Sequence, residues 1–130
     1  MSKKMQLQFL IFFMSSCIVL AHVKSTTHFV GDDKGWCSPP NPGFYNEWAK
    51  ARKFTVGDVI VFQYNPGLNT VAQVGTREDY DHCSGTNIIQ TYFFGKTAIT
   101  LDKPGDYFFF SSVGKHCEAG QKLMITACVA

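Results

Sequence analysis

The chain of 130 residues is long enough for one domain, and its formal net charge of +2 is too small to suggest nucleic acid as the main partner. Apolar residues make up 45% of the chain and charged residues 17%, a balance that permits a packed core and excludes general disorder. The 12 Phe, 5 Tyr and 2 Trp favour β-structure over a helical bundle, because aromatic side chains suit pleated sheets.

The N-terminal segment has the pattern of a secretory signal peptide. Lys3 and Lys4 precede an apolar run over residues 9–20, which is shorter than the roughly 20 residues of a membrane-spanning helix. We predict a signal peptide at residues 1–25 and a mature domain at residues 26–130, with an uncleaved signal anchor as the alternative. Loss of three lysines with the signal peptide would change the net charge to −1. We therefore expect a secreted, extracellular protein with no membrane span.

Four cysteines follow the predicted signal peptide, at Cys37, Cys83, Cys117 and Cys128. An even count in a secreted chain predicts a disulfide framework, for which three connectivities are possible. No spacer and hydrophobic tail follow the last expected strand, so we expect no glycosylphosphatidylinositol anchor.

Short apolar runs between turn signals predict an all-β sandwich after the signal peptide. The expected strands are Thr27–Val30, Val59–Tyr64, Thr70–Val74, Ile88–Tyr92, Lys96–Leu101, Tyr107–Ser111 and Lys122–Val129. One helix is expected at Phe44–Lys50, where Trp48 would pack onto the sandwich. The run Phe108–Phe110 predicts a central strand that is buried on both faces rather than a binding stripe. Asp32 and Asp33 follow a glycine, which is typical of turn residues rather than of a carboxylate pair.

The loop between the last two expected strands carries the most informative residues. Ser111, His116, Cys117 and Gln121 lie in its sequence SSVGKHCEAGQK. A type-1 copper site uses two His, one Cys thiolate and a weak axial Met or Gln. Three of these ligands usually come from one loop between two strands, and this loop has a suitable position and length.

Seven short motifs, in order along the chain, resemble the phytocyanins, which are plant blue-copper proteins. The motifs are VGD with GW at 30–36, NEWA at 46–49, FTVGD at 54–58, VFQY at 61–64, YDHC at 80–83, PGDYFF at 104–109 and HCEAGQK at 116–122. The resemblance covers nearly all of the mature chain. It implies a cupredoxin-like Greek-key β-sandwich with one or two short helices.

The resemblance also places the four copper-ligand positions of the family on this chain, and two of them are changed. Asn69 stands at the first His position and Ser111 at the Cys position, whereas His116 and Gln121 keep the second His and the axial position. A Ser hydroxyl stays protonated at neutral pH and an Asn amide is a weak donor, so we expect no type-1 copper site. The sequence is similar to the early nodulin-like branch, in which the copper ligands are replaced. We expect no cofactor, with copper only if an atypical site binds it.

The same resemblance pairs Cys83 with Cys117, which would tie the central loop to the former ligand loop. We expect a second bond between Cys37 and Cys128, although a single bridge is the common family pattern. Two free thiols, or an intermolecular link through Cys37, are the alternatives.

The expected function, implied by the resemblance, is recognition of an unknown component of the plant cell surface or wall, a glycan or a receptor. The alternative is a blue-copper-type electron-transfer protein with an atypical copper site. We expect no enzyme, because Ser111 and His116 lack an orienting carboxylate at a motif position. His82 and His116 would flank the Cys83–Cys117 bond. A metal site there is the alternative, but two His without a thiolate or carboxylate favour a solvated loop histidine.

Overall fold

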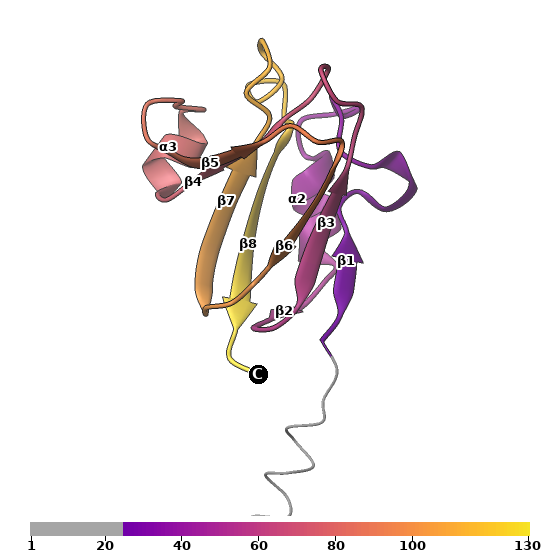
Figure 1. The fold of residues 1–130 in the computed structure, drawn as a ribbon, viewed down its shortest axis with the longest axis vertical. Helices are drawn as coiled ribbons and strands as arrows, with labels where there is room; N and C mark the ends of the chain where they lie inside the picture. The colour runs from indigo at the N-terminus through magenta and orange to yellow at the C-terminus, as the bar shows by residue number, and fades with distance from the viewer. Residues whose placement is uncertain (1–24) are drawn as a thin grey trace, which may run out of the picture.

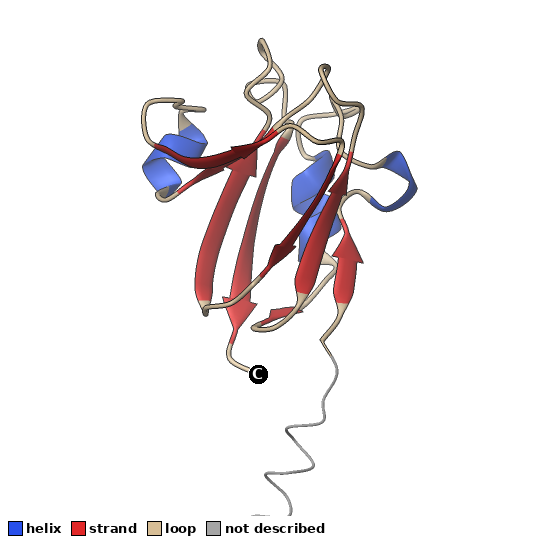
Figure 2. Ribbon diagram, in the orientation of Figure 1, coloured by secondary structure: helices blue, strands red, loops and turns tan. Residues whose placement is uncertain are grey.

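The computed structural model describes residues 25–130, which form a sandwich of two β-sheets with short helices at its margins (Figures 1 and 2). One sheet has the strand order β1-β3-β6, and the other has the order β2-β8-β7-β4-β5. The strands are β1 (Thr27–Phe29), β2 (Phe54–Thr55), β3 (Val59–Gln63), β4 (Val71–Val74), β5 (Ile88–Tyr92), β6 (Lys96–Thr100), β7 (Gly105–Phe110) and β8 (Lys122–Cys128). The predicted all-β sandwich is confirmed.

The predicted signal peptide, residues 1–25, lies outside the described residues except for Ser25. Within residues 25–130, no helix has the length and apolar character needed to cross a membrane.

Each predicted strand is present with its ends shifted by at most two residues. Strand β7 lies between β4 and β8, and the exposed fractions of Phe108, Phe109 and Phe110 are 5%, 0% and 2%. The prediction of a central strand buried on both faces is therefore confirmed. Strand β2 has only two residues and was not predicted.

The helices are short and lie outside the two sheets (Figure 2). They are the 3₁₀-helix η1 (Asp32–Lys34), α2 (Phe44–Lys50) and α3 (Arg77–Asp81). Helix α2 has its predicted bounds, and its Trp48 ring packs 5.8 Å from the ring of Phe54. Helix α3 was not predicted, although its signal is present: the Thr76 hydroxyl accepts a hydrogen bond from Asp79 N at 3.1 Å, the pattern of an N-cap.

A chain of aromatic contacts in the core joins the sheets to α2. Trp36 packs 4.8 Å from Tyr45 and 4.9 Å from Phe62, and Phe62 packs 5.2 Å from Phe109. All four side chains are at most 1% exposed. Such contacts add to the hydrophobic free energy of burial, so they fix the loop that follows η1 against β3.

The two ends of the sandwich are distinct. The loops after β3 and β7 lie at the end opposite the C-terminus (Figure 1). At that end Trp36 N donates to Gln63 O at 2.8 Å, which places Cys37 beside the last residue of β3. At the other end Val56 N donates to Cys128 O at 2.9 Å, next to the start of β3.

The expected bond between Cys37 and Cys128 is therefore wrong, and both residues are free thiols. Strand β3 rises about 3.3 Å per residue over its length, so it separates the two cysteines by more than about 10 Å. A disulfide requires Cα atoms within about 7 Å of each other.

Candidate functional site

The four residues that the resemblance places at the family's copper-ligand positions come together at the loop end of the sandwich. Asn69 precedes β4, Ser111 follows β7, Gln121 precedes β8, and His116 lies in the loop between the last two. Gln121 Nε2 donates to Asn69 Oδ1 at 3.0 Å. Ser111 N donates to Gln121 O at 3.1 Å, and Gln121 N donates to His116 O at 2.9 Å. These four residues are called the polar cluster below.

Ser111 is held by backbone amides and is shielded from solvent. Its Oγ accepts hydrogen bonds from Thr70 N at 3.3 Å and from Val113 N at 3.5 Å, and the residue is 1% exposed. A nucleophilic serine needs a base within hydrogen-bond reach and access to substrate. The hydroxyl of Ser111 makes no hydrogen bond to His116 among the described residues, and its burial keeps substrate away. The geometry therefore gives no support to hydrolytic chemistry.

Two buried atoms of the polar cluster have no hydrogen-bond partner among the described residues: His116 Nδ1 and Gln121 Oε1. Gln121 is fully buried, whereas His116 is partly exposed. Buried polar atoms are paired in the great majority of proteins, and an exception calls for a reason. The two unpaired atoms lie on the two positions that keep the residue types of the family.

Thr70 joins the loop before β4 to the loop after β7 by hydrogen bonds. This role of Thr70 was not predicted from the sequence. Its carbonyl oxygen accepts a hydrogen bond from Trp36 Nε1 at 2.8 Å. Its hydroxyl lies 2.8 Å from Ser112 Oγ and accepts from Ser112 N at 2.9 Å. No local sequence signal marks this residue, because its partners are more than 30 residues away.

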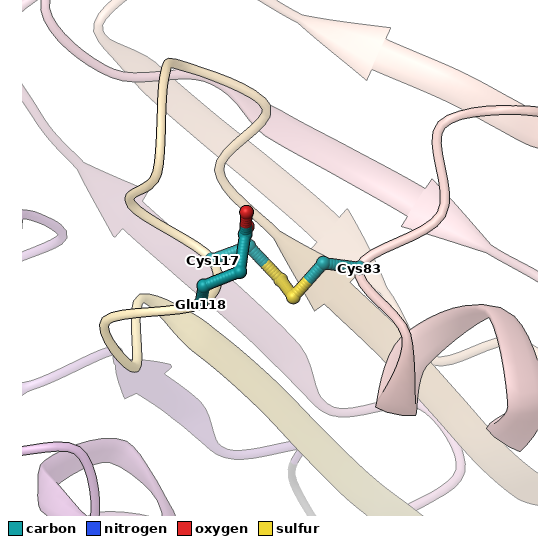
Figure 3. A group of neighbouring side chains, drawn as sticks. All are labelled: Cys83, Cys117 and Glu118. Atoms are coloured by element: carbon teal, nitrogen blue, oxygen red, sulfur yellow. A yellow bond between two sulfur atoms is a disulfide. The ribbon is translucent and has the colours of Figure 1, made fainter.

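The disulfide between Cys83 and Cys117 is confirmed, and it ties the loop before β5 to the loop that carries His116 (Figure 3). The bond closes a separation of 34 residues, which corresponds to about 3–4 kcal/mol in the chain-entropy description. Glu118 lies close to both sulfurs. Cysteine binds a metal as its thiolate, so two sulfurs joined in a disulfide and Glu118 do not make a metal site.

His82 is exposed and lies directly after α3, outside the polar cluster. Its Nδ1 lies 2.9 Å from Glu78 O, one turn back along the helix. This arrangement agrees with the expected solvated loop histidine.

Lys122 anchors α3 to β8 beside the disulfide. Its Nζ donates to Tyr80 O at 2.7 Å and lies 4.1 Å from the centre of the Tyr80 ring. Burial lowers the pKa of Lys122, although the nearby carboxylates of Asp81 and Glu118 oppose this effect. Burial raises the pKa of Tyr80 to about 12. The Tyr80 hydroxyl therefore stays protonated at neutral pH.

A groove of about 810 Å³ opens beside the polar cluster. Its lining includes Phe29, Asp33, Lys34, Asn65, Asn69 and Lys96. Asn69 belongs to both the groove and the polar cluster, whereas the other three cluster residues do not line the groove. Ser111 and Gln121 are therefore shielded from solvent. His116 is partly exposed, and Asn69 borders the groove.

A two-sheet sandwich with a disulfide-tied loop of this kind at one end defines a cupredoxin-like domain. A family model described as a plastocyanin-like domain matches residues 36–121. Early nodulin-like protein 15 of Arabidopsis thaliana is 40% identical over 117 residues, which cover 88% of this chain and 66% of that protein. Cucumber peeling cupredoxin of Cucumis sativus is 36% identical over 108 residues, covering 82% of this chain and 79% of that one.

The structural comparison agrees with the sequence comparison. Cucumber stellacyanin, solved with Cu²⁺ at pH 7.0, superposes with a TM-score of 0.76 and 34% identity, covering 83% of this chain and 99% of the stellacyanin. The chain belongs to the phytocyanin family of plastocyanin-like proteins. It spans about half to two thirds of the length of the first two early nodulin-like relatives.

Proposed function

We propose that this phytocyanin acts by recognition at the plant cell surface or wall and does not form a type-1 copper site. The residue that carries this proposal is Ser111, because the resemblance places its protonated hydroxyl at the position of the family's copper thiolate. The blue-copper electronic structure depends on a copper–thiolate bond, which no other residue of the polar cluster supplies.

The hydrogen bonds of the polar cluster also argue against a type-1 site. Asn69 Oδ1 already accepts a hydrogen bond from Gln121 Nε2, and Ser111 Oγ accepts from two backbone amides. The buried side-chain atoms of the cluster that have no hydrogen-bond partner among the described residues are His116 Nδ1 and Gln121 Oε1. One imidazole nitrogen and one amide oxygen do not fit a centre that needs two imidazoles and a thiolate.

A copper titration tests this part of the proposal. The protein secreted by an expression host, with its disulfide intact, is titrated with Cu(II) and followed by visible absorption and electron paramagnetic resonance. We expect weak binding and no intense thiolate-to-copper band. The double variant Asn69→His/Ser111→Cys restores both missing ligands on the same scaffold, so it should gain the band. Tight 1:1 binding with an intense band in the unmodified protein would contradict the proposal.

The groove beside Asn69 supports recognition as the activity of the domain. Its amide, carboxylate and ammonium groups can exchange hydrogen bonds with hydroxyl-rich ligands, and Phe29 is 46% exposed beside them. A wall glycan or the ectodomain of a receptor would meet this end of the molecule. The groove and the exposed edge of His116 would then form one contact surface.

Binding to solubilised wall polysaccharides and to cell-surface membrane fractions tests this second part. The variant His116→Ala should lose binding, whereas His82→Ala, which removes an exposed histidine directly after α3, should keep it. Unchanged binding by His116→Ala would remove the polar cluster from the contact surface.

The two unpaired buried atoms favour one alternative function, electron transfer through an atypical copper site. His116 Nδ1 and Gln121 Oε1 make no hydrogen bond among the described residues, so both are available as ligand atoms for copper. A reversible one-electron couple of the copper-loaded protein in cyclic voltammetry would favour this alternative over recognition.

A further inference from the structure

Strand β5 is the outermost strand of the five-stranded sheet, at its rim beside α3 (Figure 1). It pairs with β4, and within residues 25–130 no strand pairs with its other edge. An unpaired edge presents a row of backbone N–H and C=O groups, which is a template for another strand.

The sequence of this edge lacks the features that usually prevent edge-to-edge pairing. Residues 84–95, SGTNIIQTYFFG, contain no charged residue and no proline. The exposed fractions of Ile89, Phe93 and Phe94 are 61%, 59% and 82%. A long, uncharged edge with exposed large apolar side chains is a predicted association surface.

The other sheet edges of the described residues are protected in ordinary ways. Strands β1 and β2 have three and two residues, which is too short for extended pairing. Strand β6 begins at Lys96, and a charge on an edge strand opposes association. The missing protection is therefore specific to β5.

We propose that a second copy of this chain covers β5, with the two β5 strands antiparallel about a two-fold axis near Gln90. Such a contact is self-complementary, because each strand presents the same edge to the other. It joins the five-stranded sheets of both copies into one sheet. The exposed side chains of Ile89 and Phe93 become covered in the same step.

The charges around β5 favour the antiparallel arrangement. Helix α3, just before β5, carries Glu78 and Asp79 in addition to an Arg77–Asp81 ion pair of 3.1 Å. Lys96 follows β5 at its other end. In an antiparallel pair the acidic end of one copy lies opposite the Lys96 end of the other, whereas a parallel pair would bring like charges together.

Sedimentation equilibrium tests this proposal on the secreted protein in a Cys37→Ser/Cys128→Ser background, which removes both free thiols. The apparent mass should double between about 1 and about 500 µM, a range suited to a small interface. Hydrogen exchange of residues 88–93 should slow at the higher concentration. Ile89→Lys and Phe93→Lys should each raise the dissociation constant at least about tenfold.

The control Val129→Lys also replaces an exposed apolar residue, 78% exposed, but lies at the opposite end of the sandwich. It should leave the dissociation constant unchanged. A monomeric mass over the whole range would overturn the proposal. So would a dimer that both the Ile89→Lys and the Phe93→Lys variants leave intact, or protection of residues 88–93 that appears only when a different protein is added.

Discussion

Removal of one partner of the Asn69–Gln121 hydrogen bond should destabilise the protein unequally, depending on which partner is removed. Both side chains are buried, at 5% and 0% exposure, and the bond length is 3.0 Å. In Asn69→Ala, the Gln121 amide keeps its unpaired Oε1 and also loses the partner of Nε2. An unsatisfied buried donor costs about 1–3 kcal/mol, so we expect a loss of about 2 kcal/mol in the free energy of unfolding.

The reverse substitution, Gln121→Leu, should cost less. It leaves Asn69 Oδ1 unpaired, but it also removes the buried Gln121 Oε1, which has no partner in the native protein. These two effects have similar sizes and opposite signs, so we expect a net change within about 1 kcal/mol. The volumes of Gln and Leu are similar, which keeps packing effects small.

Urea unfolding of both variants at neutral pH measures this difference. For a domain of this size, a loss of about 2 kcal/mol also lowers the melting temperature by roughly 10 °C. Asn65→Ala, an exposed turn residue of the same loop, serves as the control and should change stability by less than about 0.5 kcal/mol. A larger loss in Gln121→Leu than in Asn69→Ala would refute this account of the polar cluster.

Two further predictions concern stability elsewhere in the fold. Burial alone would raise the pKa of Asp58, but hydrogen bonds from His28 and from two backbone amides outweigh it and hold the pKa below its usual 3.8. The stabilisation from Asp58 is therefore complete above pH 3.8 and is lost as the pH falls through the lower folded-state pKa. Asp58→Ala should lower the free energy of unfolding by about 3–5 kcal/mol at neutral pH. The variant should also lose less stability than the unmodified protein as the pH falls below 3.8, measured by urea unfolding; an equal loss in both proteins would contradict this. Gly120 has φ +112°, and a Cβ there would lie 2.6 Å from Pro42 Cα, so Gly120→Ala should cost more than about 2 kcal/mol in thermal unfolding. Gly114, with φ +49° and open space around it, is the control, and equal costs for the two Ala variants would count against the steric argument.

The local pattern of the sequence was sufficient for most of the secondary structure. The continuous apolar run Phe108–Phe110 predicted a doubly buried strand, and the bounds of α2 were predicted to the residue. Helix α3 was missed because its capping signal spans few residues and its apolar content is low. Family resemblance supplied the Cys83–Cys117 bond, which the cysteine count alone left open among three connectivities.

The polar cluster could be predicted as a set of residues but not as a geometry. The family resemblance implied that Asn69 and Ser111 stand where the family carries a histidine and a cysteine. It did not show that Asn69 bonds Gln121 across 52 positions of sequence, or that the cluster is closed while the groove beside Asn69 is open. The role of Thr70 likewise depends on a partner 41 positions away.

Residue types and the spacing between near neighbours were enough to predict the class of fold and the positions of most strands, because both depend on local patterns. Only the tertiary structure decided that Cys37 and Cys128 lie at opposite ends of β3 and that β5 has an unpaired edge. These properties depend on which strands pair and in which register. Strand pairing joins segments far apart along the chain, so no local pattern of residues contains it.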